Sequence, residues 1–537
     1  MRKLIAALGA AALLSTTAIA IAPSANAAAP TCTTDSKGLE TCTGKLSNGA
    51  GYLIKVPAKY NGTFFYWNHG VRFTYPLAGV VTVPKGVEEL TPSNVPEKQM
   101  LLSGYGLATY DRVSPGGLRG WDAAAGVEML KELIDVVKAN YTVKKGVVYG
   151  SSLAGAILTP FIEKYPTYAD AVGIMAGVTP SIGQSVQSLC DAFYILSVFA
   201  DPTIKGCAAM GVKGAAGFYA AAAEFGKVVA LLTAWGGNLG APGLEYPAAL
   251  KGSGIPQRSA LLLTGLLIGL PAKSAHMDGI TTSAVIPEQS INATVAILEN
   301  FGEAIATGTF GGQAISEITG PGFYDNTKTN WFSLLDPADS GRYNLGLSGD
   351  GAIAGMLGVL SLAPRVTGDP AAVAKLKALD KSKFDTTKPV VLLSNEADRL
   401  VFSGNQALYQ DKARAVYDAK LAIYEAARDN AATSAERAAA AKLKPFFNVA
   451  SLYAMTPETY TKYTAAGLPD FAAAIAPSGV GHESFTKKQT MAWVKILAHA
   501  ADTGKVGTPG YLQQYIKRAP GLNSDLDYRP ADLKYIW

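Results

Sequence analysis

The sequence predicts an α/β protein whose mostly parallel sheet is covered by helices on both faces. Strand-like and helix-like segments alternate between residues 51 and 178, which is the pattern of parallel strands joined by helices. The alternation stops over 179–387 and resumes with a hydrophobic run at 388–394. Hydrophobic residues make up 49% of the 537 residues and charged residues 17%, a balance typical of a well-packed globular chain rather than a disordered one.

The strands and helices before residue 178 follow from hydrophobic periodicity. Alternating apolar residues at 51–56 and an aromatic run at 63–67 predict strands, with turn residues at Asn61 and Gly62 between them. Apolar residues after 121 recur at the helical spacing. In chain order, we expect strands at 51–56, 63–67, 105–110, 146–149 and 171–175, and helices at 121–139 and 153–165.

The interruption after residue 178 is too long for a loop and predicts an inserted, largely helical domain. Helical stretches are expected at 217–235 and 291–307. The apolar run 260–270 is too short to cross a membrane, so a buried or lid helix is expected there. The expected domains are a core of residues 28–178 and 388–537, the lid at 179–387, and a charged helical excursion at about 405–444 inside the second part of the core.

The N-terminus has the features of a secretory signal peptide. Arg2 and Lys3 precede an apolar run at 4–22, and Ala25 and Ala27 place small residues where signal peptidase cleaves. We expect residues 1–27 to be removed by cleavage after Ala27, which makes the protein secreted, without stable membrane insertion afterwards. An uncleaved anchor is the alternative, because the apolar run is nearly long enough to span a bilayer.

The four cysteines form two local pairs in the sequence, Cys32 with Cys42 and Cys190 with Cys207. In an oxidising compartment each pair is expected to close a short loop, and the spacing matches no metal site. The formal net charge is +5, part of which lies in the segment that export removes. This mild charge, without a Lys/Arg run, argues against a nucleic-acid partner.

A candidate nucleophile, Ser152, stands between the strand expected at 146–149 and the helix that follows. A serine on a sharp strand-to-helix turn needs small residues two positions before and two after it, so that strand and helix can approach closely. Gly150 and Ala154 meet this requirement, although Ala154 replaces the usual second glycine. Ser151 is the poorer choice because Tyr149 would occupy the cramped position.

A serine hydroxyl needs a base, and the chain has four histidines. His482 lies in a glycine-rich loop just before a helix, where a loop can present an imidazole at the edge of a sheet. His69 follows a strand directly and is expected to support its own loop. His276 falls in the expected lid, and His499 lies in an apolar helical stretch where packing is the default role. His482 is therefore the expected base.

The imidazole in turn needs a carboxylate, and the reaction needs donors for an oxyanion. Asp398 follows the hydrophobic run at 388–394 and is our choice, with Glu396 as the runner-up; the alternative for either is a surface acid paired with Arg399. The expected oxyanion donors are the backbone N–H groups of Leu153, directly after the serine, and of Val71, in the loop after the strand at 63–67.

These segments together resemble the α/β-hydrolase superfamily, over about 51–178 and 388–500. The carriers of the resemblance are a strand followed by His69-Gly70, the Ser152 elbow, a strand followed by Asp398, and the Gly-His482 loop, and their order matches the Ser, Asp, His order of that fold. The resemblance implies an eight-stranded, mostly parallel sheet and acyl-enzyme chemistry, and the region between the two core parts resembles the lid that many members insert. With the expected export signal, the chain is similar to a secreted esterase or lipase, although the superfamily does not fix the substrate. The tannase and feruloyl esterase branch typically has cysteines beside the serine and histidine. In this chain Ser151 and Glu483 stand there, which argues against membership of that branch.

The expected function is hydrolysis of carboxylic esters without metal or cofactor, through an acyl-enzyme on Ser152. The lid composition favours a small-molecule or polymeric ester with an apolar or aromatic part. Three alternatives stay open: a serine peptidase or amidase with the same triad, an acyltransferase, and a non-catalytic binding protein of the same fold. The last would have a damaged triad, and here one candidate exists for each role.

Overall fold

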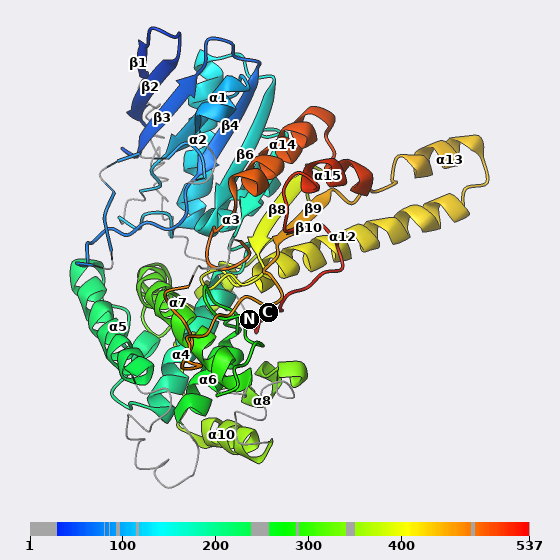
Figure 1. The fold of residues 1–537 in the computed structure, drawn as a ribbon. Coiled ribbons are helices and arrows are strands. Elements are labelled where there is room, and N and C mark those ends of the chain that lie inside the picture. The colour runs from blue at the N-terminus through cyan, green and yellow to red at the C-terminus, as the bar shows by residue number, and fades with distance from the viewer. Residues whose placement is uncertain are drawn as a thin grey trace, which may run out of the picture.

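The computed structural model describes residues 29–79, 81–84, 86–87, 89–92, 97–113, 117–237, 257–285, 289–339, 350–473, 478–535 and 537. The expected signal peptide and its cleavage site after Ala27 lie outside these residues. The chain forms a sheet flanked by helices, with a second, helical layer against one end of the sheet (Figure 1).

The sheet has ten strands in the order β1-β2-β3-β5-β4-β6-β7-β8-β9-β10 (Figure 1). The pairings from β5 through β4, β6, β7, β8 and β9 are parallel, and those of β1, β2, β3 and β10 are antiparallel. The expectation of a mostly parallel sheet is confirmed. The strands are β1 Thr31–Thr34, β2 Glu40–Lys45, β3 Gly51–Val56, β4 Thr63–Asn68, β5 Gly106–Tyr110, β6 Lys145–Ser151, β7 Ala171–Met175, β8 Val390–Asn395, β9 Val449–Ala454 and β10 Leu522–Asn523.

The expectation of eight strands was wrong, because short antiparallel strands extend both edges of the sheet. At one edge β1 folds back on β2, with Cys32 opposite Cys42 and the two bonded as a disulfide. All four residues of β1 are exposed, so no hydrophobic alternation marks this strand in the sequence. At the other edge β10 is two residues long and pairs with the end of β9, which is too short for a periodic signal.

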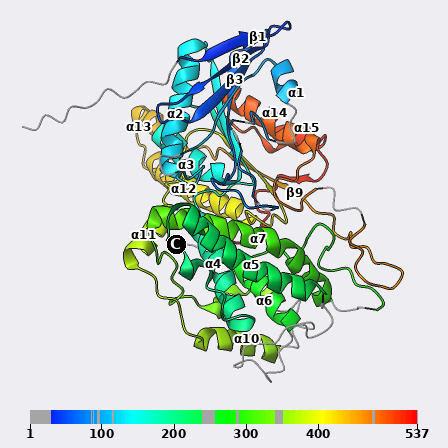
Figure 2. The same cartoon turned by 90° about the vertical axis from the view of Figure 1, so that its left-hand side faces the viewer.

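Helices cover both faces of the sheet. Successive side chains of a strand point to opposite faces, and the central strands are apolar on both, so both faces have to be covered. In β4, Phe64 and Tyr66 pack in the core formed with α2 and α3, whereas Phe65 and Trp67 pack in the core formed with α14. Figure 2 shows α2, α3 and α12 on one side of the sheet and α1, α14 and α15 on the other. These helices are α1 Glu97–Leu102, α2 Ala123–Asn140, α3 Gly155–Lys164, α12 Gly404–Asp429, α14 Lys487–Thr503 and α15 Pro509–Ile516.

The helix expected at 121–139 begins at Ala123 because of its cap. The side chain of Asp122 accepts a hydrogen bond from the N–H of Ala125 and satisfies one of the free donors of the first turn. The apolar residues that repeat every three or four positions are all buried against the sheet: Val127, Leu130, Leu133, Ile134 and Val137.

Between β7 and β8 the described chain contains helices and no strand, and these helices, here termed the helical layer, lie at the carboxyl ends of the parallel strands (Figures 1 and 2). They have their own apolar core, and a disulfide between Cys190 and Cys207 joins α4 to the following turn. Both disulfides fit an extracellular protein. The helices are α4 Ile182–Phe199, α5 Gly214–Gly237, α6 Gln257–Ile268, α7 Gln289–Thr319, α8 Trp331–Leu334, α10 Asp350–Leu362 and α11 Pro370–Ala378.

Among the described residues, one helix is long and apolar enough to cross a membrane by length and composition. It is Gly214–Gly236 of α5, in which 39% of the 18-residue apolar stretch is buried, and a core helix of a soluble protein meets the same criterion. The shorter apolar run expected as a buried helix is α6, whose residues from Ser259 to Ile268 are all buried. The charged excursion after β8 consists of α12 and α13 (Ser434–Ala441). The first turns of α12 are buried, and the far end of α12 projects away from the sheet together with α13 in Figure 1.

The C-terminal segment returns to the helical layer and contacts a buried acid there. Asp191 of α4 is 1% exposed and accepts hydrogen bonds from the hydroxyls of Tyr324, at 2.6 Å, and of Tyr535. Burial raises the pKa of Asp191 to about 7, against the opposing effect of these two hydroxyls. The folded protein therefore holds this proton at pH values where the unfolded chain has lost it.

We expect the stability of the wild type to fall between about pH 4 and pH 7 relative to that of Asp191→Asn. Over this window the folded state binds more protons than the unfolded state, so the free energy of unfolding decreases as the pH rises, by up to about 4 kcal/mol. Melting temperatures of both proteins from pH 4 to pH 8 measure the difference. Asp336→Asn, at an exposed position of the same layer, is the control. Parallel curves for the wild type and Asp191→Asn would contradict the expectation.

Candidate active site

Ser152 lies at the sharp turn between β6 and α3. Its φ is +54°, in the left-handed region that non-glycine residues rarely adopt, and the residue is 5% exposed. One turn of 3-10 helix, Ser152–Ala154, leads directly into α3. A strained serine between a strand and a helix has the geometry of a nucleophile elbow.

The residues around Ser152 explain how the turn tolerates Ala154. A Cβ atom on Gly150 would lie 2.5 Å from the carbonyl oxygen of Asn68 and 2.7 Å from the Cβ of Ala154, so only glycine fits there. The missing side chain of Gly150 leaves room for the methyl group of Ala154. A Cβ on Gly155 would lie 3.0 Å from the carbonyl oxygen of Val178. Close approach in this turn thus depends on glycines at 150 and 155.

Asp398 and His482 are brought together by the loops after β8 and β9. His482 Nδ1 lies 2.9 Å from Asp398 Oδ2. Asp398 is fully buried, and its Oδ1 accepts hydrogen bonds from the N–H groups of Leu400, at 2.9 Å, and Val401, at 3.0 Å. Two backbone N–H groups therefore fix the position of the Asp398 carboxylate while it contacts the His482 ring.

Backbone pairing between the two loops fixes the Asp398–His482 contact. The N–H of Ala397 donates to the carbonyl of Gly479 at 2.8 Å, and the N–H of Gly481 donates back to the carbonyl of Ala397 at 3.0 Å. A Cβ on Gly479, whose φ is +83°, would lie 2.4 Å from the carbonyl carbon of Met455. The glycines before His482 thus allow this loop to pass close to its neighbours.

The alternative acid and the alternative ion pairs have other partners. Glu396 accepts hydrogen bonds from Lys273 Nζ and from the N–H of Thr456, both at 2.7 Å. Arg399 pairs with Glu303 of α7, with 2.8 Å from Nε to Oε2. Arg399 thus forms its ion pair with the helical layer, and Glu396 contacts Lys273 rather than His482.

The order of the central strands, together with the positions of these loops, decides the fold. From β2 to β9 the order is β2-β3-β5-β4-β6-β7-β8-β9, with β3 antiparallel to β5 and every later pairing parallel. A serine turn follows β6, an acid follows β8 and a histidine follows β9. The chain has the α/β-hydrolase fold. This establishes an architecture, and the chemistry of the site has to be argued from its residues.

The second ring nitrogen of His482 faces Glu483, a residue to which the sequence analysis assigned no role in the site. His482 Nε2 lies 3.4 Å from Glu483 Oε1. A Cβ atom on Gly70 would lie 3.6 Å from Ser152 Oγ and 3.7 Å from the same Glu483 oxygen, so the serine and this carboxylate border the same point of the 69–71 loop. Among the described residues, Ser152 Oγ and the His482 ring form no hydrogen bond with each other. His482 thus contacts Asp398, and Ser152 lies nearby, but the hydrogen bond between Ser152 and His482 is not formed.

The charges around His482 favour its protonated form. Burial lowers the pKa of the imidazole, but the negative charges of Asp398, Glu483 and Glu303 outweigh it and raise that pKa to about 9. At neutral pH most of the His482 population is therefore protonated, and only the neutral minority is able to accept a proton.

His69 is a structural residue of the 69–71 loop in this α/β-hydrolase fold. It is 1% exposed, and its Nε2 accepts a hydrogen bond from the N–H of Arg112 at 3.0 Å. Nδ1 therefore carries the proton and donates to the carbonyl of Gly70 at 2.7 Å, which also accepts from Arg112 Nη2 at 3.0 Å. Burial, followed by the charges of Arg112 and Arg72, lowers the pKa of His69 well below its ordinary value. Because the peptide is trans, the N–H of Val71 points away from these two donors.

A small apolar pocket adjoins Ser152 beneath the helical layer. Its walls come from the turn after β4, the elbow, helices α4 and α7, and the loop that carries Asp398. The lining residues are Val71, Trp121, Ser152, Leu153, Val178, Ile182, Ser185, Val186, Leu189, Thr307, Leu400 and Val401. Both residues expected to donate to an oxyanion, Val71 and Leu153, thus line the same pocket as Ser152.

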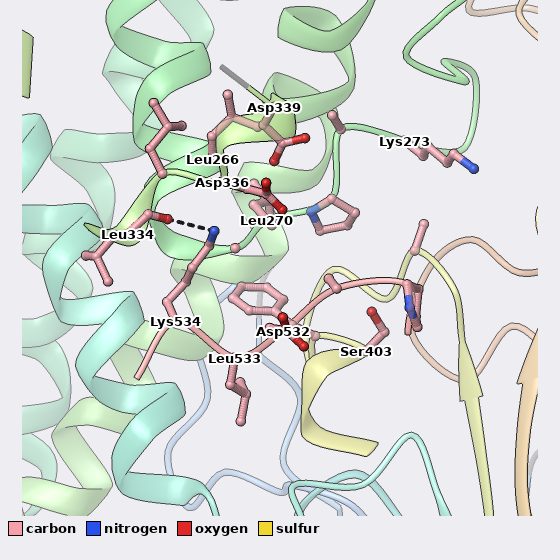
Figure 3. Close-up of a pocket in the computed structure, with 18 of the residues that line it drawn as sticks. Leu266, Leu270, Lys273, Leu334, Asp336, Asp339, Ser403, Asp532, Leu533 and Lys534 are labelled. Atoms are coloured by element: carbon pink, nitrogen blue, oxygen red, sulfur yellow. Dashed lines mark hydrogen bonds between the residues drawn. The ribbon is translucent and has the colours of Figure 1, made fainter. Parts of the chain in front are cut away.

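A larger pocket, with a volume of about 480 Å³, borders the same acid loop but includes neither Ser152 nor His482 (Figure 3). Charged side chains from the helical layer and the C-terminal segment line it, among them Asp336, Asp532 and Lys534. Lys534 Nζ donates a hydrogen bond to the carbonyl of Leu334 at 2.8 Å, the dashed line in Figure 3. The pocket beside Ser152 is therefore the candidate site.

No protein-family model matches the sequence, and no curated protein matches it. Solved structures align with long stretches of the chain at low similarity. An esterase from Aspergillus oryzae has 13% identity and a TM-score of 0.30, covering 77% of this chain and 71% of that one. Feruloyl esterase B from the same organism has 11% identity and a TM-score of 0.32, covering 80% and 79%. The rice cell wall degrading esterase LipA from Xanthomonas oryzae has 9% identity and a TM-score of 0.29, covering 73% and 88%. At these values the likenesses carry no argument about activity, and the fold assignment rests on the strand order of this chain.

Proposed function

We propose that the protein is a serine hydrolase that cleaves carboxylic esters, with Ser152 as nucleophile, His482 as base and Asp398 as the residue that orients His482. The observation that carries the proposal is the 2.9 Å contact between His482 Nδ1 and the fully buried Asp398. In the proposed arrangement Nδ1 keeps its proton and donates a hydrogen bond to the Asp398 carboxylate. Nε2 is then the ring nitrogen that accepts a proton from Ser152. The positive φ of Ser152 supports its role at the strained turn of a nucleophile elbow.

In the proposed reaction, neutral His482 takes the hydroxyl proton of Ser152 while Oγ bonds to the ester carbonyl carbon. The carbonyl π electrons move to its oxygen, and the N–H groups of Leu153 and Val71 donate to that oxyanion. The oxyanion collapses, the bond to the alcohol oxygen breaks, and His482 returns its proton to the departing alcohol. A water molecule then repeats the sequence on the acyl-enzyme and releases the acid. The chain and water supply every group that this mechanism uses.

The apolar pocket beside Ser152 is proposed to bind the acyl part of a small-molecule or polymeric ester. Its walls include Ile182, Val186 and Leu189 of α4, so the helical layer acts as a lid over the site. Apolar walls bind apolar groups by removing their surface from water. The proposed substrate is accordingly an ester whose acyl group is apolar.

A bulkier side chain at Val186 should shorten the acyl chain that the protein accepts. In Val186→Phe we expect kcat/KM for a p-nitrophenyl octanoate to fall at least about tenfold relative to that for the acetate, because the ring fills the pocket. Val198→Phe, on the same helix but not among the pocket-lining residues, is the matched control. Equal losses for both esters, or the same change in Val198→Phe, would contradict an acyl pocket at this position.

Labelling with a fluorophosphonate, followed by mass mapping of the modified peptide, tests the proposed function on the folded protein. Modification of Ser152 together with turnover of p-nitrophenyl esters is the expected result. Turnover of peptides or amides without ester turnover would support the peptidase or amidase alternative. Preferential transfer to an added alcohol would support an acyltransferase. A folded protein that is never modified would support the non-catalytic alternative.

Export is part of the proposal. The two disulfides fit an oxidising compartment, and the basic start, apolar run and small residues before Ala28 match a secretory signal. N-terminal sequencing of the protein recovered from culture medium should begin at Ala28.

A further inference from the structure

The imidazole of His482 lies between two carboxylates. Asp398 Oδ2 is 2.9 Å from Nδ1, and Glu483 Oε1 is 3.4 Å from Nε2. The Glu483 side chain is 24% exposed, and burial raises the pKa of its carboxyl group, against the opposing effects of the His482 charge and of Ser151. The nitrogen that must receive the Ser152 proton is thus the one that faces Glu483.

The backbone holds Glu483 in this position. Its φ is +56°, a left-handed conformation shared, among the described non-glycine residues, only with Ser152, Ala176 and Phe384. Its carbonyl accepts a hydrogen bond from the N–H of Phe485 at 2.9 Å. A glutamate adopts such a conformation only where the surroundings enforce it, and such positions concentrate at functional sites.

The same carboxylate is linked to the serine turn. The hydroxyl of Ser151, directly before the nucleophile, hydrogen-bonds with Glu483. The space at Gly70 is bordered both by Ser152 Oγ and by Glu483 Oε1. Glu483 therefore contacts the base on one side and the elbow on the other, which places it where the proton has to pass.

We propose that Glu483 is a positioning residue that gates the base: in the free protein its carboxylate holds the Nε2 edge of His482, and the ring accepts the Ser152 proton only after this contact opens. The inference rests on the proposed roles of Ser152 and His482. It extends them to a carboxylate that competes with the nucleophile for the same ring nitrogen.

The other charges around the pair have partners of their own. Asp398 contacts the opposite ring nitrogen, and Glu303 of α7 is paired with Arg399. Glu89, which faces Glu483, has Arg72 Nη2 at 3.6 Å from its Oε2. Glu483 is directed at the imidazole itself, and with Asp398 it raises the pKa of His482 to about 9. Removing the charge of Glu483 should therefore favour the neutral, proton-accepting ring.

The test is an NMR titration of ring-labelled histidines in the full-length mature protein, with the four histidines assigned from single substitutions. In Glu483→Gln we expect the titration midpoint of His482 to fall by at least about one pH unit. This shift increases the neutral fraction at pH 7 about tenfold, and the rate of fluorophosphonate labelling at pH 7 should rise by a similar factor. Glu303→Gln, which removes a carboxylate already paired with Arg399, should give a smaller shift.

Glu483→Asp keeps the charge on a shorter side chain and should give an intermediate midpoint, and it serves as the second variant if Glu483→Gln does not fold. An unchanged His482 midpoint in both variants would overturn the gate. Failure of the proposed function has a different signature, since the midpoint would shift in Glu483→Gln while no variant and no wild-type protein is labelled. Labelling with unshifted midpoints would retain the hydrolase and reject the role of Glu483.

Discussion

Ester turnover should fall by roughly 10⁴- to 10⁶-fold when Ser152 is replaced by alanine. The substitution removes the oxygen that is proposed to attack the carbonyl, and among the described residues Ser152 is the only one with a hydroxyl side chain and a positive φ. Fluorophosphonate labelling should disappear in the same variant. Alanine is smaller than serine and keeps the apolar pocket beside the turn, so substrate binding is retained. The measurement is kcat/KM for a p-nitrophenyl ester, together with labelling of wild type and variant.

Ser151 supplies the matched comparison for this prediction. It is the last residue of β6, with an extended φ of −125°, and its hydroxyl contacts Glu483 rather than the pocket. Ser151→Ala should keep the label on Ser152, whatever its effect on the rate. A label that survives in Ser152→Ala and disappears in Ser151→Ala would move the nucleophile by one residue.

The parts of the candidate site that sequence reasoning located are those marked by local patterns. Small residues flank Ser152 because a Cβ on Gly150 would collide with the backbone of Asn68. Glycines precede His482 because the loop passes close to Met455. Each of these close approaches requires glycine or another small residue within a few positions of the candidate side chain, and such residues are visible in the sequence. The hydrophobic strand before Asp398 is a signal of the same kind.

The parts that sequence reasoning missed depend on long-range approach. The role of Glu483 follows from a positive φ and from contacts with Ser151 and the His482 ring, and only an acid adjacent to the histidine marks it in the sequence. The outer strands β1 and β10 are exposed or very short, so periodicity does not reveal them. The pocket combines Leu153 with residues of α4 and α7 that approach it only after folding.

The choice between two acids, Asp398 and Glu396, leads to the second large effect. Asp398→Asn should lower kcat by about 10⁴-fold with the fold intact. An amide is able to keep one oxygen on the N–H groups of Leu400 and Val401, which now bond to Asp398 Oδ1. Its NH₂ group would then donate to His482 Nδ1 and favour the tautomer that carries its proton on Nε2. In that tautomer Nε2 is unable to accept the proton of Ser152. The loss should therefore appear in kcat and not in thermal stability.

Glu396→Gln is the matched control for Asp398→Asn. Glu396 lies two residues from Asp398 on the same loop, yet its carboxylate contacts Lys273 and Thr456. An amide there weakens a partly buried ion pair and lowers stability modestly, and turnover should stay within about tenfold of the wild type. Removing Asp398 also removes the first of the charges that raise the pKa of His482, so the acidic limb of the pH profile should move to lower pH in Asp398→Asn alone. Reversal of the two effects would assign the orienting carboxylate to Glu396 and would require the loop after β8 to rearrange before catalysis.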